Sequence, residues 1–252
     1  MHRFFVDPGS IDGDAVRLGG DLRRQVKDVL RLTRGERFVV LDNTGWEYEV
    51  LLSDITKDAV TGEVVRKTPC AAEPRTNIRL YQGLLKGDKF ELVLQKATEL
   101  GVSSFVPVVL ERSVASAGVS AGKMERWKRI IQEAAEQSSR GKLPELLPVM
   151  PFAGACRSAP GFRLLPWEEE ALVSLRNAMD SQMSKGSPAP QTVSIFIGSE
   201  GGITPAEVEL AVNQGIVPVT LGPRILRAET AALAVVTAVL YHLGDMESLK
   251  HG

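Results

Sequence analysis

The sequence predicts an α/β protein, in which a mostly parallel sheet covered by helices follows a small β-rich domain. From about residue 77 onward, strand patterns alternate with helical patterns, and this alternation is typical of a parallel sheet with helical crossovers. The first 72 residues instead contain short β-branched and aromatic runs bounded by turn signals. We therefore expect a barrel-like domain over residues 1–72 and a larger domain over 73–252, with a short linker at 71–74.

Within the first domain, β-branched and aromatic runs predict strands at 38–41, 47–52 and 60–67. The sequence Asp42-Asn43-Thr44-Gly45 between the first two runs is a turn signal. Before these strands, apolar residues that include Val26 and Val29 recur at helical spacing and predict one helix over 21–32. Several short strands with a single helix favour a small barrel.

The second domain contains the alternating elements that define the fold class. The segment 183–190, which contains serine, glycine and proline, predicts a flexible surface insertion between two of these elements. Strands are expected at 78–84, 104–109, 162–165, 193–197 and 217–221, and helices at 88–100, 123–139, 205–213 and 229–243. The last helix is apolar almost all round, which indicates either burial in the core or a homodimer interface.

Composition excludes several classes of protein. The chain has 252 residues, 44% of them apolar, which is enough to bury a core, and its longest apolar run is too short for a membrane helix. Two cysteines, Cys70 and Cys156, fit a reducing cytoplasm, and with three scattered histidines they show no metal-ligand spacing. The net charge of -1 argues against bulk electrostatic binding to nucleic acid, although residues 73–150 carry 12 basic and 9 acidic residues.

A glycine-rich segment, Gly198-Ser199-Glu200-Gly201-Gly202, follows one predicted strand and precedes a predicted helix. It matches no dinucleotide or phosphate-loop signature. Thr204, Pro205 and Glu207 then form a helix-start pattern with a capping box. Sequence physics leaves two interpretations open: a turn that needs glycine for its backbone angles, or a loop that approaches a ligand at the carboxyl end of a strand.

A second loop, over 219–231, carries Gly222, Arg224 and Arg227 between a buried strand and the apolar last helix. An arginine between a sheet and a buried helix is costly unless it is paired, so either arginine could pair with Glu229 or Glu200. Two glycine-containing loops at successive strand ends open on the same edge of the sheet, which favours a ligand site there.

With these loops in view, the chain resembles the SPOUT methyltransferases and, over nearly its full length, the ribosomal RNA small subunit methyltransferase E family. The resemblance depends on several motifs that occur in one order along the chain. They are Arg3-Phe4-Phe5, Val29-Leu30-Arg31, 95–102 (QKATELGV), 111–113 (ERS), 133–138 (EAAEQS), Arg140, 197–202 (IGSEGG) and 221–227 (LGPRILR). Three positions depart from the family pattern: Ser199 replaces a proline, Ala228 a threonine and Gln25 a histidine.

The resemblance implies a SPOUT domain with a deep trefoil knot, a PUA-like first domain, a homodimer, and transfer of a methyl group from S-adenosylmethionine to N3 of a uridine in 16S rRNA, free or in the assembled small ribosomal subunit. It implies no metal. Arg227, Glu229 and Glu200 are the expected catalytic side chains, because a guanidinium could stabilise the uracil anion and a carboxylate could accept the N3 proton. Glu229 could equally be a helix N-terminal carboxylate. The implied cofactor-binding residues are Leu165, Pro166, Ile197, Gly198, Glu200, Gly201, Gly202, Leu221, Gly222, Ile225, Leu226, Arg227, Thr230 and Ala231.

RNA contact is expected from clustered basic residues. Each of them could also be part of a solvated surface. The candidates are Arg3, Arg23, Arg24, Lys27, Arg31, Lys86, Arg112 and Arg140. Two other functions stay open: methylation of a different RNA nucleotide by the same fold, and RNA binding without turnover by a ribosome-assembly factor. A dehydrogenase is disfavoured, because the chain lacks the G-x-G-x-x-G motif.

Overall fold

The structure is a computed structural model that describes residues 1–113, 118–183 and 189–247. The chain divides into two compact units. The first unit comprises Met1–Glu73 and Gln132–Leu143, and the second comprises Pro74–Ile131 and Pro144–Gly252. Sequence reasoning places one boundary at 72/73, so it does not foresee that residues 132–143 join the first unit.

The first unit contains a six-stranded mixed sheet with the order β1-β4-β5-β6-β3-β2. Strands β1 and β4 are parallel, and the other neighbours are antiparallel. Instead of closing into the expected barrel, the path ends at β1 and β2, between which the described residues form no ladder. The strands are β1 (Arg3–Phe5), β2 (Ile11–Asp12), β3 (Ala15–Leu18), β4 (Arg37–Leu41), β5 (Trp46–Ile55) and β6 (Val60–Pro69). The first three are too short for a periodic signal, so the sequence does not predict them.

The predicted helix over 21–32 is shorter and irregular. It consists of α1 (Gly20–Arg24) and a π-helical turn (Gln25–Val29), in which the amide of Leu30 donates to the carbonyl of Gln25. Each π turn contains an extra residue, which shifts the side chains that follow. Val26 is therefore buried among the core residues of the unit, whereas Val29 is 69% exposed and not part of a buried stripe.

The segment 132–143 is attached to the first unit through the carboxylates of Glu136 and Glu73. Glu136 accepts from the amide of Phe5 at 3.1 Å, and burial raises the pKa of its carboxyl. Glu73 accepts from the guanidinium of Arg140 at 2.9 Å and from the amides of Gly141 and Lys142. The side chain of Arg140 is only 3% exposed. Arg140 is therefore poorly placed for the RNA contact expected from the sequence, because its charge is buried against Glu73.

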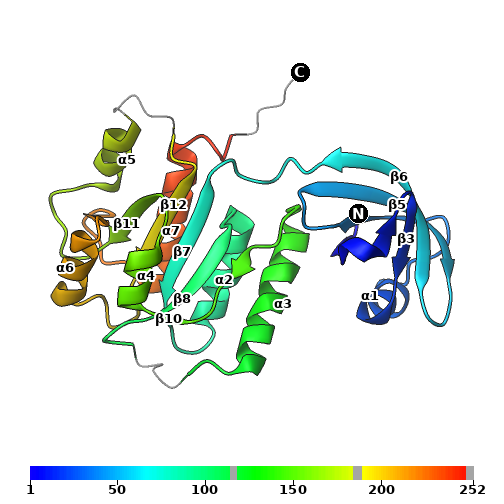
Figure 1. The fold of residues 1–252 in the computed structure, drawn as a ribbon, viewed down its shortest axis with the longest axis horizontal. Coiled ribbons are helices and arrows are strands. Elements are labelled where there is room, and N and C mark those ends of the chain that lie inside the picture. The colour runs from blue at the N-terminus through cyan, green and yellow to red at the C-terminus, as the bar shows by residue number, and fades with distance from the viewer. Residues whose placement is uncertain (114–117, 184–188, 248–252) are drawn as a thin grey trace. The chain divides into compact units, whose positions relative to one another are not determined.

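The second unit has a seven-stranded, wholly parallel sheet with the order β10-β8-β7-β12-β11-β13, with β9 also paired to β8 (Figure 1). This confirms the predicted α/β class. The strands are β7 (Asn77–Gly83), β8 (Ser104–Val109), β9 (Glu145–Leu146), β10 (Met150–Pro151), β11 (Phe162–Pro166), β12 (Thr192–Ile197) and β13 (Val217–Val219).

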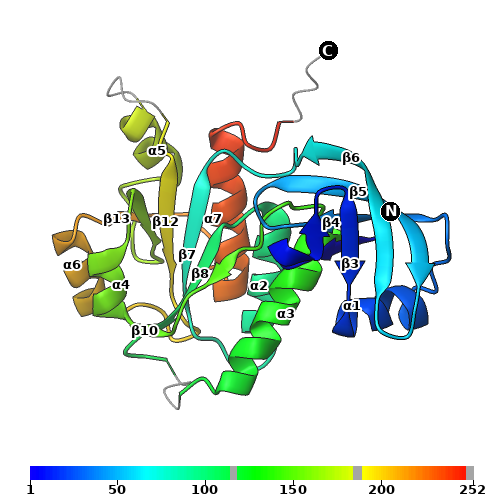
Figure 2. The ribbon, with the colours of Figure 1, turned by 45° about the vertical axis from the view of Figure 1, so that its right-hand side comes forward.

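Helices cover both faces of this sheet (Figures 1 and 2). Alternate residues of a strand point to opposite faces, so Leu164 and Ile195 join the core cluster that includes residues of α2 and α7. Leu165 and Phe196 join the cluster that includes residues of α4 and α6. The helices are α2 (Lys89–Leu100), α3 (Ala121–Gln137), α4 (Phe152–Ser158), α5 (Leu175–Met183), α6 (Pro205–Asn213) and α7 (Ala228–His242). The sequence does not predict α4 and α5. Of the predicted insertion, residues 184–188 lie outside the described part.

The last helix, α7, is buried on one side only. Ala232, Val235, Val236, Val239 and Leu240 are in the core, whereas Ala234 and Ala238 are exposed and Tyr241 is 73% exposed. After α7, the carboxylate of Asp245 accepts from the amides of Arg75 and Thr76 and from the Arg75 guanidinium. Burial raises the pKa of Asp245, but these bonds outweigh it and hold the pKa below its ordinary value. Within the described ranges, no helix could span a membrane.

Candidate active site

The candidate site is a cavity of about 870 Å³ in the second unit, where β11, β12 and β13 end. These strands are parallel neighbours, so the loops that follow them meet at one edge of the sheet. The first wall is the segment 166–171, the second is the loop 197–203, and the third is the loop 220–229 that leads into α7. An open α/β sheet commonly binds its ligand at this edge.

The glycine loop 198–202 is a tight turn in which each glycine has a separate reason. Gly202 has φ +74°, a backbone angle that side chains disfavour. A Cβ on Gly201 would lie 2.8 Å from the carbonyl oxygen of Arg112, so this glycine packs against the neighbouring loop. A Cβ on Gly198 would lie 3.0 Å from the side chain of Ile203. The hydroxyl of Ser199 accepts from the amide of Gly201 at 3.3 Å. Serine, where the family pattern has proline, thus supports the turn with a hydrogen bond.

Two residues at the end of β7 support this loop from behind. Gln82 is buried, and its amide nitrogen donates to the carbonyl of Gly198 at 3.2 Å. A Cβ on Gly83 would lie 2.7 Å from the amide nitrogen of Ser199. Sequence reasoning misses both residues. The available signal is a glutamine followed by glycine at the end of a strand, directly after Leu80 and Tyr81.

Glu200 is engaged by two donors from the segment that leads into α2. Its Oε1 accepts from the amide of Lys86 at 3.0 Å and from the ammonium of Lys89 at 3.3 Å. Partial burial raises the pKa of Glu200, but the Lys86 amide and the Lys89 charge outweigh it and hold the pKa below its ordinary value. A carboxylate held ionised in this way is a weak proton acceptor. The geometry therefore makes Glu200 a residue that positions the loop, in contrast to the catalytic role expected from the sequence.

Arg227 and Glu229 both line the cavity at the start of α7. Arg227 is the exposed N-cap residue of the helix, and it makes no ion pair with a described carboxylate. Glu229 lies in the first turn, where a negative charge is favoured by the helix dipole. Neither forms the arginine–glutamate pair that was the alternative interpretation, since Glu200 pairs with Lys89 instead. Both side chains are thus available to a ligand.

The walls offer unsatisfied polar atoms to a ligand. Oε2 of Glu229 and Nε1 of Trp167 are buried and lack a hydrogen-bond partner within the described part of the chain. Both residues line the cavity. A buried acceptor and a buried donor without partners cost free energy unless a ligand or water satisfies them. Apolar walls with a few such polar groups are typical of sites for small organic cofactors.

Most residues expected to hold the cofactor do line the cavity, but Leu165 and Thr230 do not. Leu165 is fully buried, because the alternation of side chains along β11 points it into the core cluster that includes residues of α4 and α6. Thr230 lies on the exposed side of α7. The expected cofactor-binding residues that line the cavity are Pro166, Ile197, Gly198, Glu200, Gly201, Gly202, Leu221, Gly222, Ile225, Leu226, Arg227 and Ala231. Glu229, which was expected as a catalytic residue, also lines it. Lining residues that the sequence does not indicate include Trp167, Glu168 and Glu170.

The basic candidates for RNA contact differ in how available they are. Lys86 and Arg112 are exposed beside the glycine loop, where Arg112 donates to the carbonyl of Gly201 at 3.4 Å. In the first unit, Lys27 and Arg31 are exposed, while Arg24 pairs weakly with Asp21 and Arg23 donates to the carbonyl of Thr56. The side chain of Arg3 is 14% exposed and pairs with Glu47 at 2.6 Å. Arg3 is therefore poorly placed to bind phosphate, contrary to expectation.

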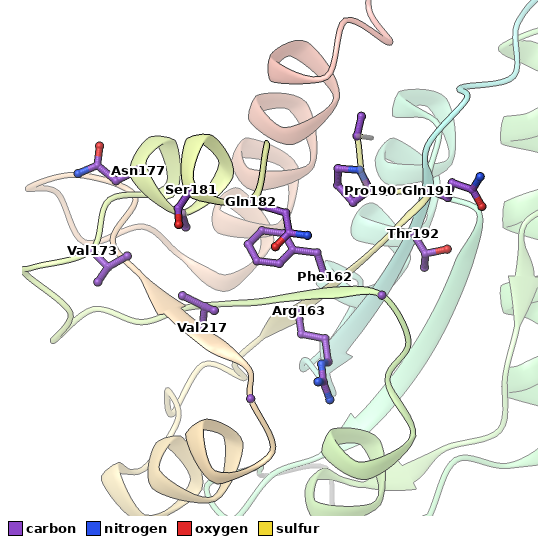
Figure 3. A pocket seen from close by; sticks show the side chains of 14 residues that line it. Phe162, Arg163, Val173, Asn177, Ser181, Gln182, Pro190, Gln191, Thr192 and Val217 are labelled. Carbon is purple, nitrogen blue, oxygen red and sulfur yellow. The ribbon is translucent and has the colours of Figure 1, made fainter. Parts of the chain in front are cut away.

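A second hollow, of about 800 Å³, lies at the amino ends of β11 and β12 (Figure 3). In Figure 3 the side chains of Phe162 and Gln182 lie on one side of β11, and Arg163 leaves on the other side. The polar side chains that line this hollow do not converge on one point, so the hollow offers no defined site for a ligand. Nor do the described residues contain a cluster of three or more His, Cys, Asp or Glu side chains that could hold a metal ion.

Comparison with known proteins agrees with this geometry. The family described as RNA methyltransferase domain matches residues 72–240. The ribosomal RNA small subunit methyltransferase E of Bacillus subtilis is 33% identical over 251 residues, which cover 96% of each chain. The Synechocystis protein of the same name is 34% identical over 242 residues, 95% of this chain and 78% of its own. The chain belongs to the ribosomal RNA small subunit methyltransferase E family.

Two solved structures share the fold. The methyltransferase E of Neisseria gonorrhoeae bound to S-adenosyl methionine has a TM-score of 0.84 and 30% identity, covering 96% of this chain and 98% of that one. A methyltransferase of Legionella pneumophila in complex with the cofactor SAM has a TM-score of 0.81 and 28% identity, covering 95% and 97%. The family resemblance stated from the motifs is thereby confirmed.

Proposed function

We propose that this chain transfers a methyl group from S-adenosylmethionine to N3 of a uridine in the 16S rRNA of the small ribosomal subunit. The observation that carries the proposal is the cavity at the carboxyl ends of β11, β12 and β13, in a chain that matches a methyltransferase E over 96% of its length. Two relatives of similar fold bind S-adenosylmethionine. Such a function places the protein in the cytoplasm, where rRNA is modified.

The residues of the cavity suit this cofactor. Backbone groups at Ile197, Gly198, Leu221 and Leu226 can bind the edge of an adenine, and the apolar side chains can cover its faces. Trp167 Nε1 and Glu229 Oε2 supply a free donor and a free acceptor. When bound, S-adenosylmethionine supplies the electrophilic methyl group. We further propose that the segments around β12 and β13 form the trefoil knot of a SPOUT domain and that the first unit is PUA-like and binds RNA.

The side chains at the start of α7 are the candidates for activating N3 of the uridine. N3 of uridine becomes a good nucleophile only after it loses its proton, so the site must stabilise an anionic uracil. We assign this role to the guanidinium of Arg227, which lines the cavity without a carboxylate partner. The carboxylate of Glu229 is the candidate proton acceptor. Fixing the two reactants in line contributes up to about 7–11 kcal/mol in the best intramolecular cases.

Replacing Arg227 separates these roles. We expect Arg227→Ala to reduce single-turnover methyl transfer by about a hundredfold or more, because one preorganised donor contributes about 2.7–4 kcal/mol. The affinity for S-adenosylmethionine, measured by calorimetry, should change only a few-fold. An equal loss of both quantities would show that Arg227 serves cofactor binding and not the reaction.

The exposed side of α7 supports the homodimer that the family resemblance implies. A shallow apolar hollow of about 550 Å³ on this side is lined by Leu92, Leu233, Ala234, Ala238 and Tyr241. It also reaches Glu229, so it lies next to the cofactor cavity. Light scattering coupled to gel filtration should give twice the 27.3 kDa chain mass. A monomer at micromolar concentration would overturn the dimer.

The decisive experiment for the reaction is methyl transfer to unmodified small ribosomal subunits with isotope-labelled S-adenosylmethionine. The rRNA is digested to nucleosides, which are separated by mass spectrometry. We expect labelled 3-methyluridine. Label in another nucleoside would keep the fold and cofactor but change the target. Absence of both label and cofactor binding would favour an assembly factor that binds RNA without turnover.

A further inference from the structure

An aromatic side chain with basic neighbours lies at the start of β5 in the first unit. Trp46 is the first residue of β5, and it is 41% exposed. Alternate residues share one face of a strand, so Trp46 continues the row of Tyr48 and Val50, both of which are buried in the core. The indole thus lies where the core-facing row reaches solvent.

One lysine lies over this indole, and a second lies beside the preceding residue, Gly45. Lys67 lies opposite Tyr48 on β6, and its ammonium is 5.0 Å from the ring centre of Trp46 and 4.9 Å from that of Tyr48. Lys142 belongs to the segment 132–143 of the same unit, and its Cε lies 3.1 Å from where a Cβ on Gly45 would be. Both lysines are exposed, and neither is paired with a carboxylate of the described residues.

The nearest acidic side chains are engaged elsewhere. Glu47 accepts from Arg3 at 2.6 Å and from the hydroxyl of Thr68 at 3.2 Å. Asp42 accepts from the hydroxyl of Tyr48 at 2.8 Å and from the amide and hydroxyl of Thr44. Because these carboxylates are already hydrogen-bonded, the charges of Lys67 and Lys142 remain available to an anionic ligand.

We propose that Trp46, with Lys67 and Lys142, is a stacking site for an unpaired base of the RNA. This inference rests on the proposed function, which makes RNA the partner of the chain. An exposed indole can stack on the face of any base, and flanking ammonium groups bind the phosphates beside it. Paired bases keep their faces inside a helix, so the ligand is a single-stranded nucleotide. Lys67 has a flexible side chain, which can leave the indole for a phosphate when the base arrives.

The Trp46 site differs chemically from the group of basic residues around α1 in the same unit. The basic residues around α1, including Lys27 and Arg31, have no exposed aromatic neighbour among the described residues, so we expect them to contact mainly the backbone phosphates. The Trp46 site adds base stacking, which depends on a base being present and little on which base it is.

Binding of an oligouridylate of about ten nucleotides tests the site, with the same oligomer containing abasic positions as a probe for phosphate contact alone. The variants are Trp46→Ala, Trp46→Phe and Lys67→Gln, with Val65→Ala as the matched control. Val65 is another exposed apolar residue, 43% exposed, on the neighbouring strand β6. Affinity is measured by fluorescence anisotropy at several salt concentrations, and folding of each variant by circular dichroism.

We expect Trp46→Ala to weaken oligouridylate binding about tenfold and to leave the abasic oligomer unaffected. Trp46→Phe should retain most of the affinity, and Lys67→Gln should lower the salt slope by about one. Oligouridylate should also quench the emission of the wild-type protein more than that of Trp46→Phe, because the variant keeps Trp127 and Trp167 but lacks the indole of the stacking site. Val65→Ala should behave as the wild type.

Three results would overturn the inference. They are wild-type affinity in folded Trp46→Ala, an equal loss for the abasic oligomer, and failure of the wild type to bind the oligouridylate at low salt. Each is distinct from failure of the proposed function, which the labelling of rRNA decides. In that assay Trp46→Ala should raise KM for the ribosomal substrate and leave kcat and cofactor affinity unchanged.

Discussion

Gly83 lies outside the cavity, yet its replacement should disable the site. In Gly83→Ala, the new Cβ would lie 2.7 Å from the amide nitrogen of Ser199 and 2.8 Å from the carbonyl carbon of Gly198. Ordinary contact begins at 3.4 Å, so the glycine loop must move by roughly 0.7 Å. These are backbone atoms, which cannot rotate out of the way as the nearby methyl of Leu110 can. The displacement also lengthens the 3.2 Å bond from Gln82 to Gly198.

The consequence should appear in both binding and turnover. Overpacking costs about 1–3 kcal/mol of stability, and a misplacement of about 1 Å costs up to a hundredfold in rate. We expect the Kd for S-adenosylmethionine to rise about tenfold and single-turnover transfer to fall by more than that. Gly154→Ala in α4 is the matched control, since nothing lies within 4 Å of its added Cβ. Wild-type binding and turnover in Gly83→Ala would refute the argument that β7 supports the loop.

The remaining predictions concern three charged groups. Arg140→Ala leaves the carboxylate of Glu73 without its buried partner, so urea unfolding should show a loss of about 3 kcal/mol, while the salt dependence of RNA binding stays unchanged. Asp245→Asn should remove an acid-sensitive contribution: the depressed pKa of Asp245 stabilises the folded state above its ordinary value of 3.8, and this is lost as pH falls through the folded pKa. The free energy of unfolding, measured from pH 6 to pH 3 (about two units above that value to one below it), should therefore fall less steeply with pH in the variant. Glu200→Gln keeps an acceptor for the amide of Lys86 but loses the charge facing Lys89, so cofactor affinity should fall about fivefold without a change in the shape of the pH–rate profile. A lost basic limb would instead show that Glu200 accepts the proton.

Local sequence patterns predict much of the fold. The capping box at Thr204 and Glu207 and the proline after it are present as predicted, because these bonds form within one helical turn. Strand β8 and helix α6 have their predicted bounds, since a short apolar run defines the strand and the capping box with its proline marks the start of the helix. The helix over 21–32 was predicted wrongly in its second half, because a π turn depends on packing that a 3.6-residue repeat does not describe.

The sequence by itself determined the parallel α/β class, the family and two of the three segments that line the cavity, because periodicity, glycine and ordered motifs are local properties. Only the tertiary structure showed that Arg140 is buried against Glu73, that Glu200 is held by Lys86 and Lys89, and that Gln82 and Gly83 support the glycine loop. Each of these roles depends on a partner 67 to 116 residues away in sequence. The charge or size of one residue cannot identify a partner that the chain brings close only by folding.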